Sequence, residues 1–234
     1  SKERKRRPSP PFTTSTLQQE ASRKLGFTTK RTMQVAQKLY EGVTLGDEGT
    51  VGLISYMRTD SVNLSAEAVA EIRDVIARDY GTQAVPDKPN TYQTKSKNAQ
   101  EAHEAVRPTS ALRTPAQMAR YLDDDARRLY ELIWKRAVAC QMVPATLNTV
   151  SVDLAAGSEH SFRVSGTTVV DPGFLAVYEE GKDAKAAEDD DEGRKLPAMK
   201  TGDRIPLDRI HADQHFTEPP PRYSEASLVK ALEE

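Results

Sequence analysis

A tyrosine and an arginine two residues apart form the strongest candidate for chemistry in this 234-residue sequence. Tyr56 follows the apolar run 51–55, and Arg58 comes two positions later. Side chains two positions apart in an extended chain point to the same face, so the guanidinium is expected beside the phenol. A phenol has an ordinary pKa near ~10 and needs such help to act as a nucleophile at neutral pH. Taken alone, however, a tyrosine at the end of a strand is most often structural.

The segment 100–108 is the second cluster of chemically capable side chains. His103 lies between two glutamates, and it can donate a proton or bind phosphate while an acidic neighbour holds its tautomer. A lone histidine in such surroundings more often makes surface hydrogen bonds, so both interpretations stay open. The sequence has no Cys/His set with metal spacing and no Gly-rich phosphate loop. A structural zinc site and nucleotide hydrolysis are therefore unsupported.

Apolar residues at helical spacing predict a helical region up to about residue 142, and a short strand at 51–58 is expected to carry Tyr56. The first predicted helix opens with a capping box at 15–18, the second begins near Thr29, and the third follows a cap at Ser65. Further helices are predicted at 99–105, from a start at Thr114-Pro115, and from about Asp123 to Met142. After Pro144 the period changes to that of strands. Strands are predicted at 147–154, 162–170, 174–178 and 205–210, with a flexible acidic loop at 179–195 and a last helix capped by Ser224.

Charge is distributed unevenly along the chain. Residues 1–40 carry 10 Lys and Arg against 2 Asp and Glu, and residues 143–234 carry 10 against 18. An anionic partner such as nucleic acid would favour the N-terminal end, although a run such as 2–7 can also be a solvated linker. No apolar run reaches spanning length, so no membrane association is expected. The single Cys140 fits a reducing cytoplasm, and the two chain ends predict a piece of a longer protein.

Four blocks resemble one protein family. They are 11–19, 52–61, 100–108 and 215–226, and they occur in the same order as in the bacterial type IA DNA topoisomerases. The resemblance covers nearly the whole chain. It implies an α+β multidomain fold in which a mainly α-helical domain is inserted into a mainly antiparallel β domain.

The resemblance assigns roles to individual residues. Tyr56 matches the nucleophile, Arg58 matches an arginine that positions and neutralises the scissile phosphate, and His103 matches a histidine that assists phosphate binding or proton transfer. Asp60 is expected to hydrogen-bond His103. Contacts with DNA are expected from Thr59, Ser61 and Arg107, and no metal ligand is assigned to this chain.

The resemblance also divides the chain into domains. The expected units are a β arch formed by 1–14 and 143–222, a helical domain over 15–142, and the start of a truncated helix at 223–234. Strand passage would swing the helical domain away from the arch, which predicts hinges near 12–15 and 142–145.

The implied activity is ATP-independent cleavage and religation of one DNA strand through a 5′-phosphotyrosine intermediate, which relaxes negative supercoils. The expected partners of the full-length enzyme are single-stranded DNA and negatively supercoiled duplex DNA, and it is expected to act as a monomer in the cytoplasm. Its Mg²⁺ is expected to be held by residues outside this chain, and the chain alone is expected not to relax DNA.

Two other functions compete with this interpretation. A non-catalytic nucleic-acid-binding module built on the N-terminal helices predicts that Tyr56→Phe has no effect. A tyrosine recombinase or relaxase would need an Arg/His set or a His metal cluster at other spacings, and neither is visible.

Overall fold

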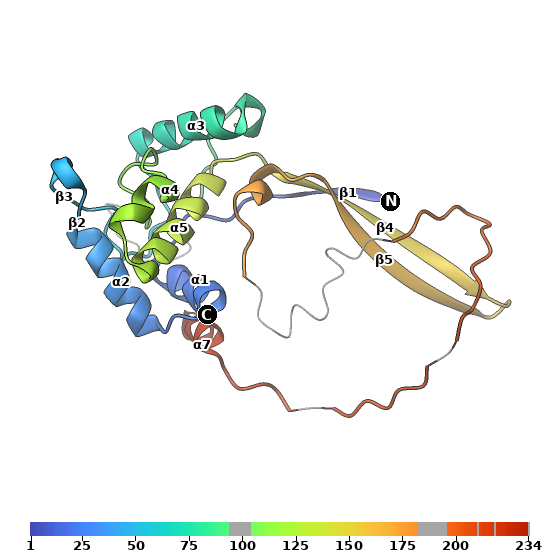
Figure 1. Cartoon of the computed structure of the whole chain (residues 1–234). Coiled ribbons are helices and arrows are strands. Elements are labelled where there is room, and N and C mark those ends of the chain that lie inside the picture. Colours follow the sequence, from blue (N-terminus) through green and yellow to red (C-terminus); the bar gives the residue numbers. More distant parts are fainter. Residues whose placement is uncertain (94–103, 182–195, 210, 218, 234) are drawn as a thin grey trace.

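The structure is a computed structural model of the chain, and it describes residues 1–93, 104–181, 196–209, 211–217 and 219–233. Figure 1 shows a helical body from which a long ribbon of strands projects, and an extended segment that leads back to a last helix beside the body. The chain combines helices with antiparallel strands, and the larger sheet is separate from the helical body. The predicted α+β class is confirmed.

The helical body contains five helices and a small hairpin among the described residues. They are α1 (Thr14–Leu25), α2 (Thr29–Glu41), the hairpin β2 (Val43–Thr44) and β3 (Thr50–Val51), α3 (Ala66–Tyr80), α4 (Pro115–Met118) and α5 (Asp124–Ala139), with 3₁₀ turns η1 (Gly46–Glu48), η2 (Thr82–Ala84) and η3 (Ala119–Tyr121).

Polar caps begin these helices. Thr28, Ser65 and Asp123 accept a hydrogen bond from the backbone N–H three residues later, which confirms the starts predicted for α2, α3 and α5. The capping box predicted at 15–18 is wrong. It forms two residues earlier, where Thr13 and Thr16 satisfy each other's backbone N–H groups.

Helix α5 forms the centre of the body, where it packs against α1, α2, α3 and α4. Leu129, Ile133 and Ala137 lie on its inner face and are fully buried. Burial of each large aliphatic side chain stabilises the fold by roughly 1.5–3 kcal/mol, so this face holds the helices together.

The ribbon is a three-stranded antiparallel sheet in the order β1-β4-β5. It consists of β1 (Lys2–Arg6), β4 (Ala145–Ala156) and β5 (His160–Asp171), and the register between β4 and β5 shifts at Thr146/Leu147. Strand β1 pairs with residues 145–149, so the two ends of the helical body's sequence meet in one sheet.

Two predicted strands are wrong in the described residues. The run 174–178 forms the 3₁₀ turn η4 (Gly173–Ala176), because Phe174 and Tyr178 fill the core of the body and are each 4% exposed. Residues 205–209 form no strand, and Ile210 lies outside the described residues. A run of alternating apolar residues forms a strand only where a neighbouring strand pairs with it.

Two further predicted elements, at 51–58 and 99–105, form only in part or lie partly outside the described residues. Of the strand predicted at 51–58, only Val51 belongs to a strand, as the second residue of β3, and Ile54 adds an isolated bridge to Pro108. Residues 104–105 of the helix predicted at 99–105 are not helical, and its other residues are not described. Ser224 does cap the last helix, α7 (Glu225–Glu233). In the described part of the chain, no helix has the length and apolar character needed to cross a membrane.

Candidate active site

The segment 52–61 presents its side chains alternately to the interior and to solvent. Tyr56 is 45% exposed, and Arg58 and Asp60 are also exposed. Met57 between them is fully buried. The exposed and buried positions therefore alternate as in an extended chain, which agrees with the face predicted for Tyr56 and Arg58, although the segment is not a regular strand.

The first residue of α1 holds this segment from one side. The Thr14 hydroxyl donates to the Met57 carbonyl at 2.8 Å and accepts from the Thr59 N–H at 2.8 Å. The Thr14 N–H donates to the Thr59 carbonyl, also at 2.8 Å. Because both backbone peptides around Arg58 are bonded to one threonine, the guanidinium projects from a fixed point.

Residues 105–108 hold the segment from the other side. The Ser55 N–H donates to the Arg107 carbonyl at 2.9 Å, and the Ser55 hydroxyl donates to the Ala105 carbonyl at 2.7 Å. An isolated bridge joins Phe12 to Val106. The two blocks that the sequence singled out for chemistry therefore lie side by side. His103 itself lies outside the described residues.

The three residues predicted to contact DNA have partners within the protein. The Thr59 and Ser61 side chains are buried, and their hydroxyls accept from the Ser61 N–H at 3.0 Å and the Asn63 N–H at 3.1 Å. Arg107 pairs with Glu104 at 2.6 Å. Arg58, in contrast, forms no ion pair or hydrogen bond with any part of the chain that the structure describes. Among these residues, Arg58 is the cation that is free for an external anion.

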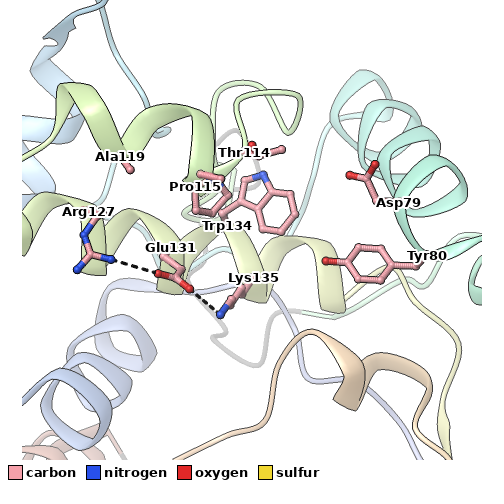
Figure 2. A pocket seen from close by; sticks show the side chains of 10 residues that line it. Asp79, Tyr80, Thr114, Pro115, Ala119, Arg127, Glu131, Trp134 and Lys135 are labelled. Atoms are coloured by element: carbon pink, nitrogen blue, oxygen red, sulfur yellow. Dashed lines mark ion pairs between the residues drawn. The ribbon is translucent and has the colours of Figure 1, made fainter.

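A separate hollow lies on another side of the body. It encloses about 470 Å³ between α3, α4 and α5, and Figure 2 shows Tyr80 and Trp134 in its wall. Three of its charged side chains bond to one another, since Glu131 lies 2.6 Å from Lys135 and 3.9 Å from Arg127, and the fourth, Asp79, pairs with Arg78. No residue of the segment 52–61 lines it. It is not the site of Tyr56.

The sequence model of a family described as DNA topoisomerase matches residues 1–234, the whole chain. The chain belongs to the DNA topoisomerase family. The predicted resemblance is thereby confirmed, and the segment around Tyr56 is a topoisomerase segment.

Relatives and solved structures agree with this family. DNA topoisomerase 1 of Xylella fastidiosa (strain 9a5c) is 78% identical over 233 residues, and that of Rickettsia felis is 53% identical over 234 residues; each match covers the whole chain. The structure of full-length topoisomerase I from Thermotoga maritima matches 99% of this chain, with 32% sequence identity and a TM-score of 0.74. The match covers 36% of the Thermotoga chain. The chain spans about 30% of the length of the relatives named here.

A bound metal ion would need several donor side chains close together. Among the described residues, no group of three or more His, Cys, Asp or Glu side chains lies close enough to hold a metal ion. Asp60 is one exposed carboxylate beside Arg58. The described part of this segment therefore offers no donor set that fits Mg²⁺.

The residues that anchor the segment of Tyr56 were not predicted from the sequence. Thr14 and Ser55 act through hydrogen bonds to residues 43 to 50 positions away along the chain. No local pattern signals such contacts. The two chemical blocks, 52–61 and 100–108, were the only available sign that these parts of the chain meet.

Proposed function

We propose that Tyr56 is the nucleophile of a type IA DNA topoisomerase and that this chain supplies the tyrosine-bearing part of the enzyme. The observation that supports this most directly is the exposed Tyr56 phenol on a doubly anchored segment, followed two residues later by the exposed Arg58, which has no partner within the part of the chain that the structure describes. An exposed phenol beside a free guanidinium is suited to attack on a phosphodiester.

The proposed step exchanges one phosphate ester for another. The Tyr56 oxygen loses its proton and bonds to phosphorus, the bond from phosphorus to the deoxyribose 3′-oxygen breaks, and that oxygen takes up a proton. The 5′-phosphate stays esterified to Tyr56. Because the number of ester bonds is unchanged, attack by the 3′-hydroxyl restores the strand without ATP.

Arg58 is proposed to bind a non-bridging oxygen of the scissile phosphate and to offset the charge that develops on it. His103 is proposed to assist phosphate binding or proton transfer, and Asp60 to orient it. Thr59, Ser61 and Arg107 are proposed DNA contacts. Because the hydroxyls of Thr59 and Ser61 are buried, these two residues would influence DNA binding by holding the backbone of the segment in shape.

The activity of the whole protein belongs to the same proposal. The full-length enzyme would relax negatively supercoiled DNA as a cytoplasmic monomer, bind single-stranded DNA and use Mg²⁺ held outside this chain. Residues 1–14 with 143–222 would form the arch and 15–142 the moving domain, and the pairing of β1 with β4 supports the first of these units. The chain alone is expected to leave supercoiled DNA unrelaxed.

The test uses a chimera in which this chain replaces the matching segment of Xylella fastidiosa DNA topoisomerase 1. A labelled single-stranded oligonucleotide is trapped with denaturant, and the modified residue is mapped by peptide mass spectrometry. The adduct is expected on Tyr56 and is expected to be absent in Tyr56→Phe, while oligonucleotide affinity changes less than about threefold. An adduct on another residue, or an unchanged adduct yield in Tyr56→Phe, would refute the proposal and favour a binding module.

A further inference from the structure

A second tyrosine contacts the proposed nucleophile. Tyr40 lies in the last turn of α2, and its ring centroid is 5.3 Å from that of Tyr56, with an angle of 64° between the ring planes. This is an edge-to-face contact, one of the arrangements that aromatic pairs prefer. Both rings are partly open to solvent, with Tyr40 40% and Tyr56 45% exposed.

The backbone brings the two rings together. The Leu53 N–H donates to the Leu39 carbonyl at 2.8 Å, which joins the segment of Tyr56 to the end of α2. Gly52 passes so close to this helix that a Cβ atom on it would lie 2.7 Å from the Tyr40 carbonyl oxygen. Only a residue without a side chain permits this approach, so the contact between the rings is built into the backbone path.

Packing of the core does not account for Tyr40. Its neighbour Leu39 and Ala36, one turn earlier, are fully buried and attach α2 to the body. The Tyr40 hydroxyl has no hydrogen-bond partner in the described part of the chain. What Tyr40 contributes is therefore its ring, and the neighbouring aromatic surface is that of Tyr56.

We propose that Tyr40 is a positioning residue that holds the Tyr56 ring in the orientation needed for attack on the phosphodiester. A partly exposed tyrosine without a neighbour changes rotamer on the picosecond to nanosecond scale, whereas an edge-to-face contact with a second ring restricts these changes. Attack requires the reacting oxygen to be aligned with phosphorus, and loss of alignment slows the step itself. This role rests on the proposed function of Tyr56.

The test compares Tyr40→Leu and Tyr40→Phe in the chimera. The rate of adduct formation is measured in a single turnover at saturating oligonucleotide, and the affinity is measured separately by fluorescence anisotropy. Tyr40→Leu is expected to slow adduct formation about tenfold while the Kd stays within about twofold. Tyr40→Phe keeps the ring and is expected to restore most of the rate.

Tyr80→Leu is the matched control, because it removes a tyrosine ring from the last turn of another helix that faces the hollow of Figure 2. It is expected to react at the rate of the unsubstituted chimera. The role of Tyr40 is overturned if Tyr40→Leu reacts normally, if it weakens binding alone, as loss of a platform for a base would, or if Tyr40→Phe is as slow as Tyr40→Leu. An adduct that persists in Tyr56→Phe refutes the proposed nucleophile instead, so the two failures are distinguishable.

Discussion

At the scale of single residues, the Thr14 hydroxyl is the group on which the backbone of the candidate site depends. It is both donor and acceptor for the peptides around Arg58. Replacement of this hydroxyl by a methyl group of similar size would leave the Met57 carbonyl and the Thr59 N–H each without one partner. Partly buried polar groups that lose a partner destabilise a protein more than an exposed substitution does.

Thr14→Val is therefore expected to lower the free energy of unfolding by about 1–2 kcal/mol. Thr44→Val, at an exposed position of β2, is the control and is expected to change it by less than about 0.5 kcal/mol. Urea denaturation of the two variants measures both values. Equal effects of the two substitutions would mean that the Thr14 hydroxyl does not anchor the segment.

Cys140 gives a second prediction at this scale. It is fully buried after the last turn of α5, and burial raises the pKa of its thiol to about 12. The folded protein then binds this proton more tightly than the unfolded chain, so the contribution of the thiol to stability is complete below pH 9 and is lost as the pH rises towards 12. At pH 8 we expect a thiol reagent to label Cys140 only in unfolding concentrations of urea. Labelling of the native protein at the rate of a free cysteine would contradict this burial.

At the scale of elements, Arg136 of α5 joins the segment between β1 and α1 to the segment that follows β5. It donates to the Pro10 carbonyl at 2.6 Å and to Glu180 at 2.9 Å, and its guanidinium lies over the rings of Phe12 and Tyr178. Its side chain is 6% exposed. One buried cation therefore fastens both of these segments to α5.

Arg136→Met is expected to lower the free energy of unfolding by roughly 2–3 kcal/mol, because charge-assisted bonds to a buried guanidinium are lost. Arg127→Met on the same helix breaks an exposed pair with Asp124 and is expected to cost less than about 1 kcal/mol. Thermal denaturation of both variants compares the two positions. If Arg127→Met proved the more harmful, the fastening role of Arg136 would be wrong.

Features carried by neighbouring residues were predictable from the sequence. The starts of α2, α3 and α5 follow from Thr28, Ser65 and Asp123 and the backbone N–H groups three residues later. The spacing of Tyr56 and Arg58 predicted that their side chains point to the same face, and both residues are exposed on either side of the buried Met57. The run 174–178 was mispredicted, because apolar residues there serve the core of the body, and the partners Arg136 and Phe12 are far away in the sequence. The Tyr40–Tyr56 contact was missed for the same reason.

At the scale of the whole molecule, Figure 1 shows residues 196–209, 211–217 and 219–224 running as an extended trace towards α7, which lies beside the body. There α7 packs against α1, where the Ser15 hydroxyl donates to Glu233 at 2.6 Å. The Thr29 N–H at the start of α2 donates to Glu225 at 2.6 Å. The body is thus held at two places, by the ribbon base and by α7. If the body swings relative to the ribbon, the connection at the ribbon base has to bend and the contact with α7 has to be released.

The bend is now expected in the ribbon, and not at 12–15 and 142–145 as the sequence predicted. Phe12 and Ala145 are fully buried, and the Val143 N–H donates to the Ala84 carbonyl at 3.0 Å within the body. The register shift at Thr146/Leu147 is the first irregularity beyond this packed base. A bulge is a weak point in a ladder of hydrogen bonds, so the ribbon can bend there while the base stays packed.

Hydrogen exchange of the chain at neutral pH tests this location. The amides of Val143 and Phe174 are expected to exchange as slowly as those of α5, since all of them open only with the body. Amides paired between β1 and residues 146–149 are expected to exchange at least about tenfold faster. If Val143 exchanges faster than these ribbon amides, the joint lies at 142–145 after all, and the packed base moves with the ribbon.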